Sequence, residues 1–178
     1  MLIVIVKQAL SVLTVGAQIF LALGFIYFLF FRKSKETFWI EFISKNVLKL
    51  GFMVALIATA GSLFFSEVAG FEPCRLCWFQ RTFMYPEVIL LGLAWIRKNN
   101  KIIDYALSLA VVGTLISLYH NYIYYLAQKT AFCSVAAPCT TPYVLEFGYV
   151  TIPLMALTAF LSLIFLFSIQ KVYAGLTE

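Results

Sequence analysis

The sequence predicts an all-α, polytopic membrane protein, and two observations carry this prediction. First, 63% of the 178 residues are hydrophobic and only 12% are charged, with a mean hydropathy of +0.95. Soluble domains contain about half apolar and about a quarter charged residues. Second, apolar stretches of about 20 residues, the length that crosses a bilayer, recur along the whole chain. No stretch remains for a separate soluble domain, so we expect one bundle.

Five segments are long and apolar enough to be predicted as transmembrane helices: residues 10–31, 47–65, 78–96, 102–126 and 150–169. The first is interpreted as a helix and not as a signal peptide, because its apolar stretch is too long and no small-residue cleavage site follows it.

Basic residues predict the orientation of these five spans. Nine of the 13 lysines and arginines lie in three segments: after the first span, between the third and fourth spans, and after the last. They are Arg32, Lys33, Lys35, Lys45, Lys49, Arg97, Lys98, Lys101 and Lys171. The positive-inside rule places these segments in the cytoplasm. The amino terminus and segments 66–77 and 127–149 then lie outside, the carboxyl terminus lies inside, and the net charge gives no reason to expect nucleic acid as a partner.

All four cysteines fall in the predicted outer segments, on the oxidising side of a cell membrane. Cys74 and Cys77 form a C-x-x-C sequence after Pro73 and open the third span. In the first turn of a helix, unpaired backbone N–H groups and the helix dipole stabilise a thiolate. Cys133 and Cys139 form a second pair in an outer loop.

Three interpretations of these cysteines follow from their spacing alone. A four-thiolate zinc site would need an unusual spacing across a transmembrane hairpin, and we expect no metal ion. Two structural disulfides in a membrane subunit without catalytic activity are the second interpretation. The third is a thiol relay, in which electrons pass between the two pairs and leave through a molecule dissolved in the membrane. C-x-x-C is more typical of redox motifs than of structural bridges, which favours the relay.

Three polar residues within the predicted spans are candidates for function. Arg81 stands four residues after Cys77, on the same helical face, where it can steady a thiolate or donate to a ligand carbonyl; snorkelling to the head groups is the alternative. His120, the only histidine, lies near the outer end of the fourth span and can donate a hydrogen bond or pass a proton. Glu87 is expected to be neutral or paired, with no partner evident.

Together these sequences resemble the bacterial disulfide bond formation protein B family, DsbB, and its shorter relatives of the BdbC type. The resemblance rests on PCRLCWFQR at 73–81, MYP at 84–86, the tyrosine-rich segment with His120, the pair Cys133 and Cys139, and FGYVTIP at 147–153. It covers the chain from about residue 47 to about residue 169.

The resemblance implies that residues 47–178 form a four-helix bundle, and that residues 1–46 add one N-terminal helix and a basic connection. This bundle would reoxidise a secreted thioredoxin-fold oxidase of the DsbA or BdbD type and pass two electrons to a membrane quinone, ubiquinone or menaquinone. Cys77 would contact the quinone ring, with Arg81 and His120 binding near it. The thiolate of the partner would attack Cys133, and Cys139 would then exchange with Cys74. The location implied is the cytoplasmic membrane, with the cysteines on the outer face.

Two features differ from the family pattern. The helix before residue 47 is additional to the usual four, and the five-residue spacer between Cys133 and Cys139 is similar to that of the shorter relatives. A vitamin K epoxide reductase-like protein is a further alternative, since it also combines a helical bundle, paired cysteines and a quinone. There the redox C-x-x-C follows the loop pair, whereas here Cys74 and Cys77 precede it.

Overall fold

The computed structural model describes residues 1–31, 38–126, 133 and 139–177, and this part of the chain is helical. Its elements, in chain order, are α1 (Leu2–Phe31), α2 (Phe38–Leu63), the π-helix η1 (Phe64–Val68), α3 (Arg75–Arg97), the 3₁₀-helix η2 (Asn100–Ile102), α4 (Ile103–Leu126) and α5 (Ile152–Thr177). A single isolated bridge joins Glu146 and Val150, and these ranges contain no β-strand. The predicted all-α class is confirmed.

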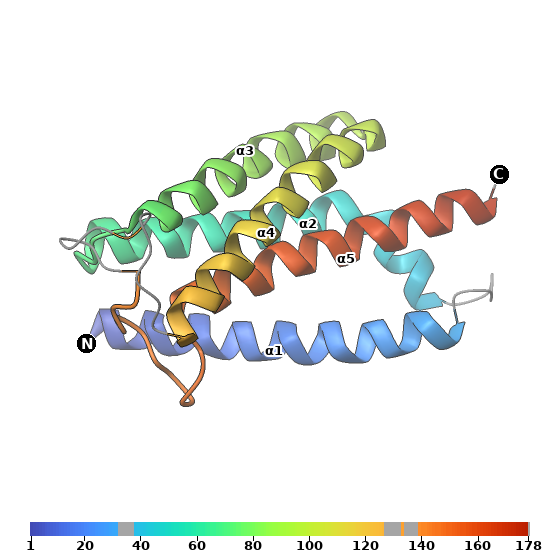
Figure 1. Cartoon of the computed structure of the whole chain (residues 1–178). Coiled ribbons are helices and arrows are strands. Elements are labelled where there is room, and N and C mark those ends of the chain that lie inside the picture. The colour runs from blue at the N-terminus through green and yellow to red at the C-terminus, as the bar shows by residue number, and fades with distance from the viewer. Residues whose placement is uncertain (32–37, 127–132, 134–138, 178) are drawn as a thin grey trace.

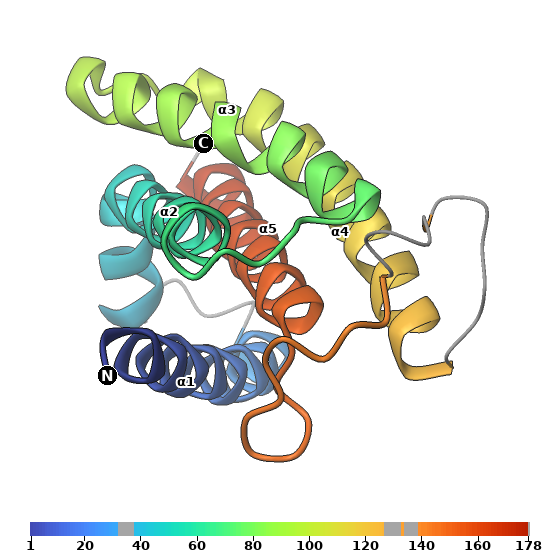
Figure 2. The same ribbon diagram turned by 90° about the vertical axis from the view of Figure 1, so that its left-hand side faces the viewer.

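Helices α2 to α5 form a bundle, and α1 packs on its outside. Helix α2 packs against α3 and α5, and α4 packs against the same two helices. Figure 2 shows this arrangement from one end, with α1 beside α2 and α5 on the side away from α3. The extra N-terminal helix therefore packs mainly against α5 of the bundle instead of standing apart from it (Figure 1).

Large side chains of α5 fill the centre of the bundle. Phe160, Leu163 and Phe167 are fully buried and pack with Leu91 of α3. Gly113 lets α4 approach α5 closely, because a Cβ atom at this position would lie 2.2 Å from Cε1 of Phe160. The absence of a side chain at Gly113 is therefore a requirement of the α4–α5 contact.

Four segments are long and apolar enough to cross a membrane within the described residues: Leu2–Tyr27, Glu41–Val68, Asn100–Leu126 and Ile152–Gly175. Helix α3 is not among them, so the predicted fifth span is not shown. The physical reason is its polar content, since α3 contains Gln80, Arg81 and Glu87. All three side chains are buried.

Two helices begin earlier than the sequence predicts. Helix α1 starts at Leu2 and not at residue 10, and α2 starts at Phe38 and not at residue 47. The added turns contain charged residues that an apolar criterion leaves out. On α2 these residues support the helix, because Lys45 Nζ and Glu41 Oε1 pair at 2.5 Å with the i, i+4 spacing.

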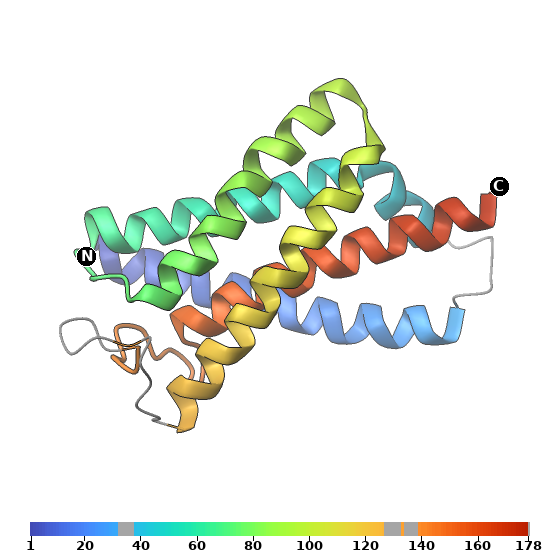
Figure 3. The same ribbon diagram turned by 45° about the horizontal axis from the view of Figure 1, so that its top comes forward.

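Most of the basic residues that the structure describes lie at the end of the bundle opposite to the cysteines. Helix α3 begins, and α4 ends, at what we call the cysteine end, while the α3–α4 connection lies at the other end (Figure 3). Arg97, Lys98 and Lys101 belong to that connection, and Lys171 Nζ pairs there with Asp104 Oδ1 at 2.6 Å. Arg32, Lys33 and Lys35 lie outside the described residues.

The α4–α5 contact gives a first prediction. Gly113→Ala should destabilise the protein by about 1–3 kcal/mol, the usual effect of overpacking, because the new Cβ would overlap the Phe160 ring. Thermal unfolding in detergent measures this loss. Gly16→Ala on α1 is the matched control, since a Cβ there meets nothing within 4 Å and should not lower the unfolding temperature. Equal unfolding temperatures for the two variants would contradict the proposed close contact.

Candidate functional site

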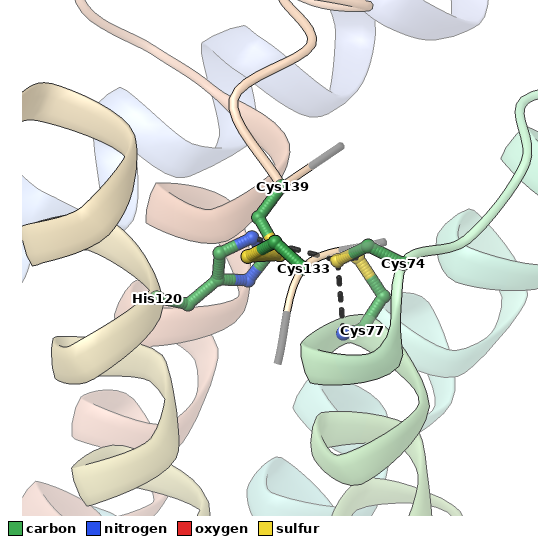
Figure 4. Close-up of a disulfide and its surroundings, with 5 residues drawn as sticks. All are labelled: Cys74, Cys77, His120, Cys133 and Cys139. Atoms are coloured by element: carbon green, nitrogen blue, oxygen red, sulfur yellow. Dashed lines mark hydrogen bonds between the residues drawn. A yellow bond between two sulfur atoms is a disulfide. The ribbon is translucent and has the colours of Figure 1, made fainter. Parts of the chain in front are cut away.

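All four cysteines gather in one cluster at the cysteine end. Cys74 and Cys139 are buried together with Leu76 and Ile123, and Cys77 and Cys133 pack against them. Cys133 and Cys139 are joined in a disulfide, while Cys74 and Cys77 are free thiols whose sulfur atoms lie 3.1 Å apart. Figure 4 shows the disulfide facing the thiol pair. Two pairs that are distant in sequence are thus neighbours, and they differ in redox state.

Cys74 is the N-cap residue of α3, and Cys77 follows in the first turn. The backbone of Cys74 is extended (φ −67°, ψ 170°), and its sulfur accepts a hydrogen bond from the Cys77 backbone N–H at 3.4 Å. A side chain in this position satisfies one of the unpaired N–H groups that open a helix. The prediction that both sulfurs lie at the start of this helix is confirmed, and the structure adds that Cys74 is the cap.

His120 comes from α4 and reaches the same sulfur. Its Nε2 lies 3.7 Å from Cys74 Sγ, its side chain is only 1% exposed, and its Nδ1 has no hydrogen-bond partner among the described residues. Hydrogen bonding from the Cys77 thiol, followed by that from His120, holds the pKa of Cys74 well below its usual range, although burial opposes this. Cys74 is therefore the thiol of this pair that is poised to ionise.

Arg81 is held inside the bundle by α2. Its Nε donates to Ser62 Oγ at 2.9 Å and its Nη2 donates to the Ser62 carbonyl oxygen at 3.0 Å. The guanidinium carbon also lies 5.2 Å from the centre of the Trp78 ring, and no carboxylate in the described ranges pairs with it. Only 8% of Arg81 is exposed, so this side chain does not snorkel to the surface. Ser62 was not singled out from the sequence, where it is one small polar residue in an apolar span.

A cavity of about 330 Å³ lies beside the cysteines. Cys74, Cys77, Arg81 and His120 all border it, so the structure brings four of the predicted site residues to one space. Cys139 of the disulfide also borders the cavity. This volume is at the lower end of the range that small-molecule and cofactor pockets occupy.

Stacked aromatic rings border the cavity at the cysteine end. Phe65 of η1 stacks on Phe71, with ring centres 5.9 Å apart, and Phe71 stacks on Tyr143 at 4.8 Å. Tyr125 donates to the Tyr149 carbonyl oxygen at 2.6 Å and ties the end of α4 to the segment before α5. These contacts tie the segment that carries Cys139 to the helices, although residues 134–138 lie outside the described part.

Buried polar residues on α3 and α4 hold the helices of the site in register. Gln80 donates to Ser117 Oγ at 3.0 Å, which joins α3 to α4. Asn121 donates to the Pro153 carbonyl oxygen at 3.0 Å, which joins α4 to α5. Sequence analysis missed these residues, yet Ser117, His120 and Asn121 follow the i, i+3, i+4 spacing of one helical face. This spacing is the feature of the sequence that identifies them as one buried polar face of a helix.

Three side chains of the site are of types that can ligate a metal ion. The ligand atoms of Cys74, Cys77 and His120 lie within 4.8 Å of one another, a set of types that zinc accepts. The four-thiolate zinc alternative does not fit, because Cys133 and Cys139 are bonded to each other.

Glu87 on α3 is fully buried, and neither of its carboxyl oxygens has a hydrogen-bond partner in the described part of the chain.

Comparison with known proteins decides the family. The model of the family described as disulfide bond formation protein DsbB matches residues 44–169, which include the whole cysteine cluster. The chain belongs to the DsbB family. No solved structure matches it.

Curated relatives of this DsbB-family chain carry consistent names. It is 49% identical over 115 residues to the probable disulfide formation protein C 1 of Bacillus anthracis, covering 61% of this chain and 80% of the relative. It is 42% identical over 125 residues to the disulfide bond formation protein C of Bacillus subtilis strain 168, covering 67% and 88%. The family and the apolar helices make the chain a multi-pass membrane protein of disulfide bond formation, an oxidoreductase that forms disulfides.

The lowered pKa of Cys74 gives a second prediction. In reduced protein, Cys74 should react with iodoacetamide well below the pH at which an ordinary thiol does, because its thiolate persists to lower pH. Cys77→Ala should move the midpoint of the pH–rate profile upward, and His120→Ala should move it upward by less, in the order of their effects on Cys74. Peptide mass spectrometry of the alkylated protein measures each profile. A profile unchanged in both variants would show that neither Cys77 nor His120 stabilises the Cys74 thiolate.

Proposed function

We propose that this protein is a thiol:quinone oxidoreductase, which reoxidises a secreted thioredoxin-fold oxidase and passes the electrons to a membrane quinone. One observation carries the proposal. The disulfide of Cys133 and Cys139 packs against the free thiols of Cys74 and Cys77, and the second pair borders a cavity together with Arg81. In this proposal, the loop pair takes electrons from a protein in water, and the helix pair passes them into the membrane.

The exchange steps balance when they run from the loop pair to the helix pair. A thiolate of the reduced partner attacks Cys133, and the bond to Cys139 breaks, so that Cys139 leaves as a thiolate. The second thiol of the partner then releases the oxidised partner. With the helix pair in its disulfide form, Cys139 attacks Cys74 and displaces Cys77, and Cys133 then attacks Cys139. This last step restores the loop disulfide and leaves Cys74 and Cys77 as free thiols, the state of the structure.

The acceptor must then oxidise the dithiol of Cys74 and Cys77. A bound quinone supplies an acceptor of two electrons and two protons. Arg81 has guanidinium N–H groups beyond the two that Ser62 engages, and these can donate to a quinone oxygen. His120, beside Cys74, can hold the proton that this thiol releases. Electrons flow toward the quinone when its reduction potential is higher than that of the cysteine pairs. Each 30 mV of this difference corresponds to about 1.4 kcal/mol for a two-electron transfer.

The orientation follows from charge and burial. We propose that α3 is a fifth span, because its 23 residues reach roughly 35 Å, and its polar residues Gln80, Arg81 and Glu87 are buried inside the bundle. Basic residues cluster at the end away from the cysteines, so by the positive-inside rule the cysteine end faces outward. This places the disulfide in the compartment of an exported DsbA- or BdbD-like partner, with the protein in the cytoplasmic membrane.

The deciding experiment combines purified protein, a reduced thioredoxin-fold oxidase and a quinone. Absorbance should report quinone reduction, and Cys77→Ser should abolish it while the loop disulfide still accepts the partner. When quinone is withheld, all four cysteines should become reduced. Two structural disulfides in a subunit without catalytic activity would instead stay oxidised with or without quinone, and that result would overturn the proposal.

The loop pair gives a third prediction. The partner variant keeps only its attacking cysteine, which is activated as a mixed disulfide with thionitrobenzoate. With Cys139→Ala, the Cys133 thiolate should attack this cysteine and displace thionitrobenzoate. The disulfide between Cys133 and the partner should then accumulate, because neither a second partner thiol nor Cys139 is present to resolve it. Non-reducing gel electrophoresis followed by peptide mapping identifies the bonded cysteine. Cys133→Ala is the control and should trap no partner. Trapping through Cys139 in that control would show that the two roles are exchanged.

Arg81 gives a fourth prediction. Charge-assisted hydrogen bonds contribute roughly 1.5–3 kcal/mol, so Arg81→Gln should weaken quinone use by about one to two powers of ten. Arg81→Lys keeps the charge but loses the planar fork, and should restore only part of the activity. Quinone-titrated turnover is measured beside thermal stability. Activity lost only in proportion to folded protein would reduce Arg81 to a structural residue that joins α3 to Ser62 of α2.

A further inference from the structure

Helix α1 lies before the residues that the family model matches, yet it borders the cavity of the site. We propose that α1 is a wall of the acceptor cavity and that the four α1 residues that border this cavity, Leu10, Leu13, Thr14 and Ala17, hold the apolar chain of a prenylated quinone. This inference rests on the proposed function, because it names which part of the acceptor the extra helix would bind.

Side-chain contacts fix α1 against the bundle at this level. Gln18 Nε2 donates to Thr158 Oγ1 of α5 at 3.2 Å, and Tyr149 donates through its hydroxyl to Gln18 Oε1 at 3.0 Å. Two residues further along α1, Phe20 meets Phe165 of α5 edge to face, with ring centres 6.1 Å apart. A glutamine that binds both α5 and the segment before it sets the rotation of α1, and therefore which of its faces looks inward.

The four α1 residues that border the cavity follow the spacing of one helical stripe. Leu10, Leu13, Thr14 and Ala17 stand at i, i+3, i+4 and i+7, and all four border the cavity. Thr14 is buried, and its hydroxyl donates to the Leu10 carbonyl oxygen at 2.8 Å, so it offers the cavity no unsatisfied donor. This wall is therefore apolar in effect.

The same helix reaches the polar part of the site. Leu10 packs on Gly61 of α2, where a Cβ atom would lie 3.0 Å from Leu10 Cδ1. Gly61 precedes Ser62, the residue that holds Arg81. The α1 wall is thus continuous with the region of Arg81 and Cys77, and one ligand can contact both.

The chemistry of the walls matches the two parts of a prenylated quinone. Cys77, Arg81 and His120 offer thiol, guanidinium and imidazole groups to a ring that carries two carbonyl oxygens. Across from the stripe, the cavity is bordered by apolar side chains of α2 and α5, among them Ile57, Ala58 and Ala156. Apolar walls of this kind can contact a hydrocarbon chain without leaving a polar group unpaired. The small side chain of Ala17 leaves the space such a chain needs.

A bulky residue at Ala17 tests this assignment in the full-length protein. The substrates are a quinone with a chain of two isoprene units and a quinone with the same ring but a methyl group in place of the chain. Ala17→Phe should raise the KM for the prenylated quinone about tenfold and change the KM for the ring-only quinone less than about twofold. Val12→Phe is the matched control, because Val12 lies on the outer face of α1 and is 58% exposed, and it should change neither value.

The outcomes of this experiment distinguish a failure of the proposed function from a failure of the role of α1. Failure of the unaltered protein to reduce either quinone would overturn the proposed function itself, before α1 is tested. An unchanged KM for the prenylated quinone in Ala17→Phe, or an equal rise for both quinones, would overturn the role of α1 while leaving the proposed function intact.

A second measurement does not depend on the folding of the phenylalanine variant. In Ala17→Cys, the prenylated quinone should slow maleimide labelling of the new cysteine, and the ring-only quinone should not. In Val12→Cys, neither quinone should slow labelling. Equal labelling rates at position 17 with and without the prenylated quinone would also overturn the role of α1.

Discussion

The site depends on the beginning of one helix. Cys74 caps α3, so its sulfur lies at the positive end of the helix and accepts the Cys77 N–H. The free Cys77 thiol and His120 stabilise the same sulfur, which makes Cys74 the ionisable member of the pair. This geometry needs a chain that turns sharply into α3 and a partner helix, α4, that ends at the same level. The remaining contacts of the bundle serve to place those two helix ends together.

Buried polar pairs perform this placement because they allow fewer alternatives than apolar packing does. In the interior of a membrane bundle, an amide or guanidinium without a partner is costly, so each pair specifies one rotation and one depth of its helix. Arg81 with Ser62 joins α3 to α2, and Gln80 with Ser117 joins α3 to α4. Asn121 extends the series to α5 through the Pro153 carbonyl oxygen. These three polar contacts lie on three of the four bundle interfaces, and on the fourth, between α2 and α5, the Ser44 hydroxyl donates to Gln170 Oε1.

Much of the fold follows from local properties of the sequence. Hydrophobic length alone indicated the helices of the bundle, because a membrane requires about 20 apolar residues for each span. The helix boundaries were less predictable, since Glu41 and Lys45 support each other within α2 although both are charged. Helix α3 shows the opposite difficulty: its polar residues face the inside of the bundle, where hydropathy does not distinguish them from residues in a loop.

The sequence by itself determined the chemistry: a C-x-x-C at the start of a helix, a second cysteine pair, and an arginine one turn below Cys77. Only the tertiary structure decided which of these groups meet. Cys74 with His120, Arg81 with Ser62, and α1 with the cavity join positions that are far apart in sequence. Such contacts depend on the rotation and depth of whole helices. Rotation and depth result from the packing of all the helices at once, which no local pattern of residues records.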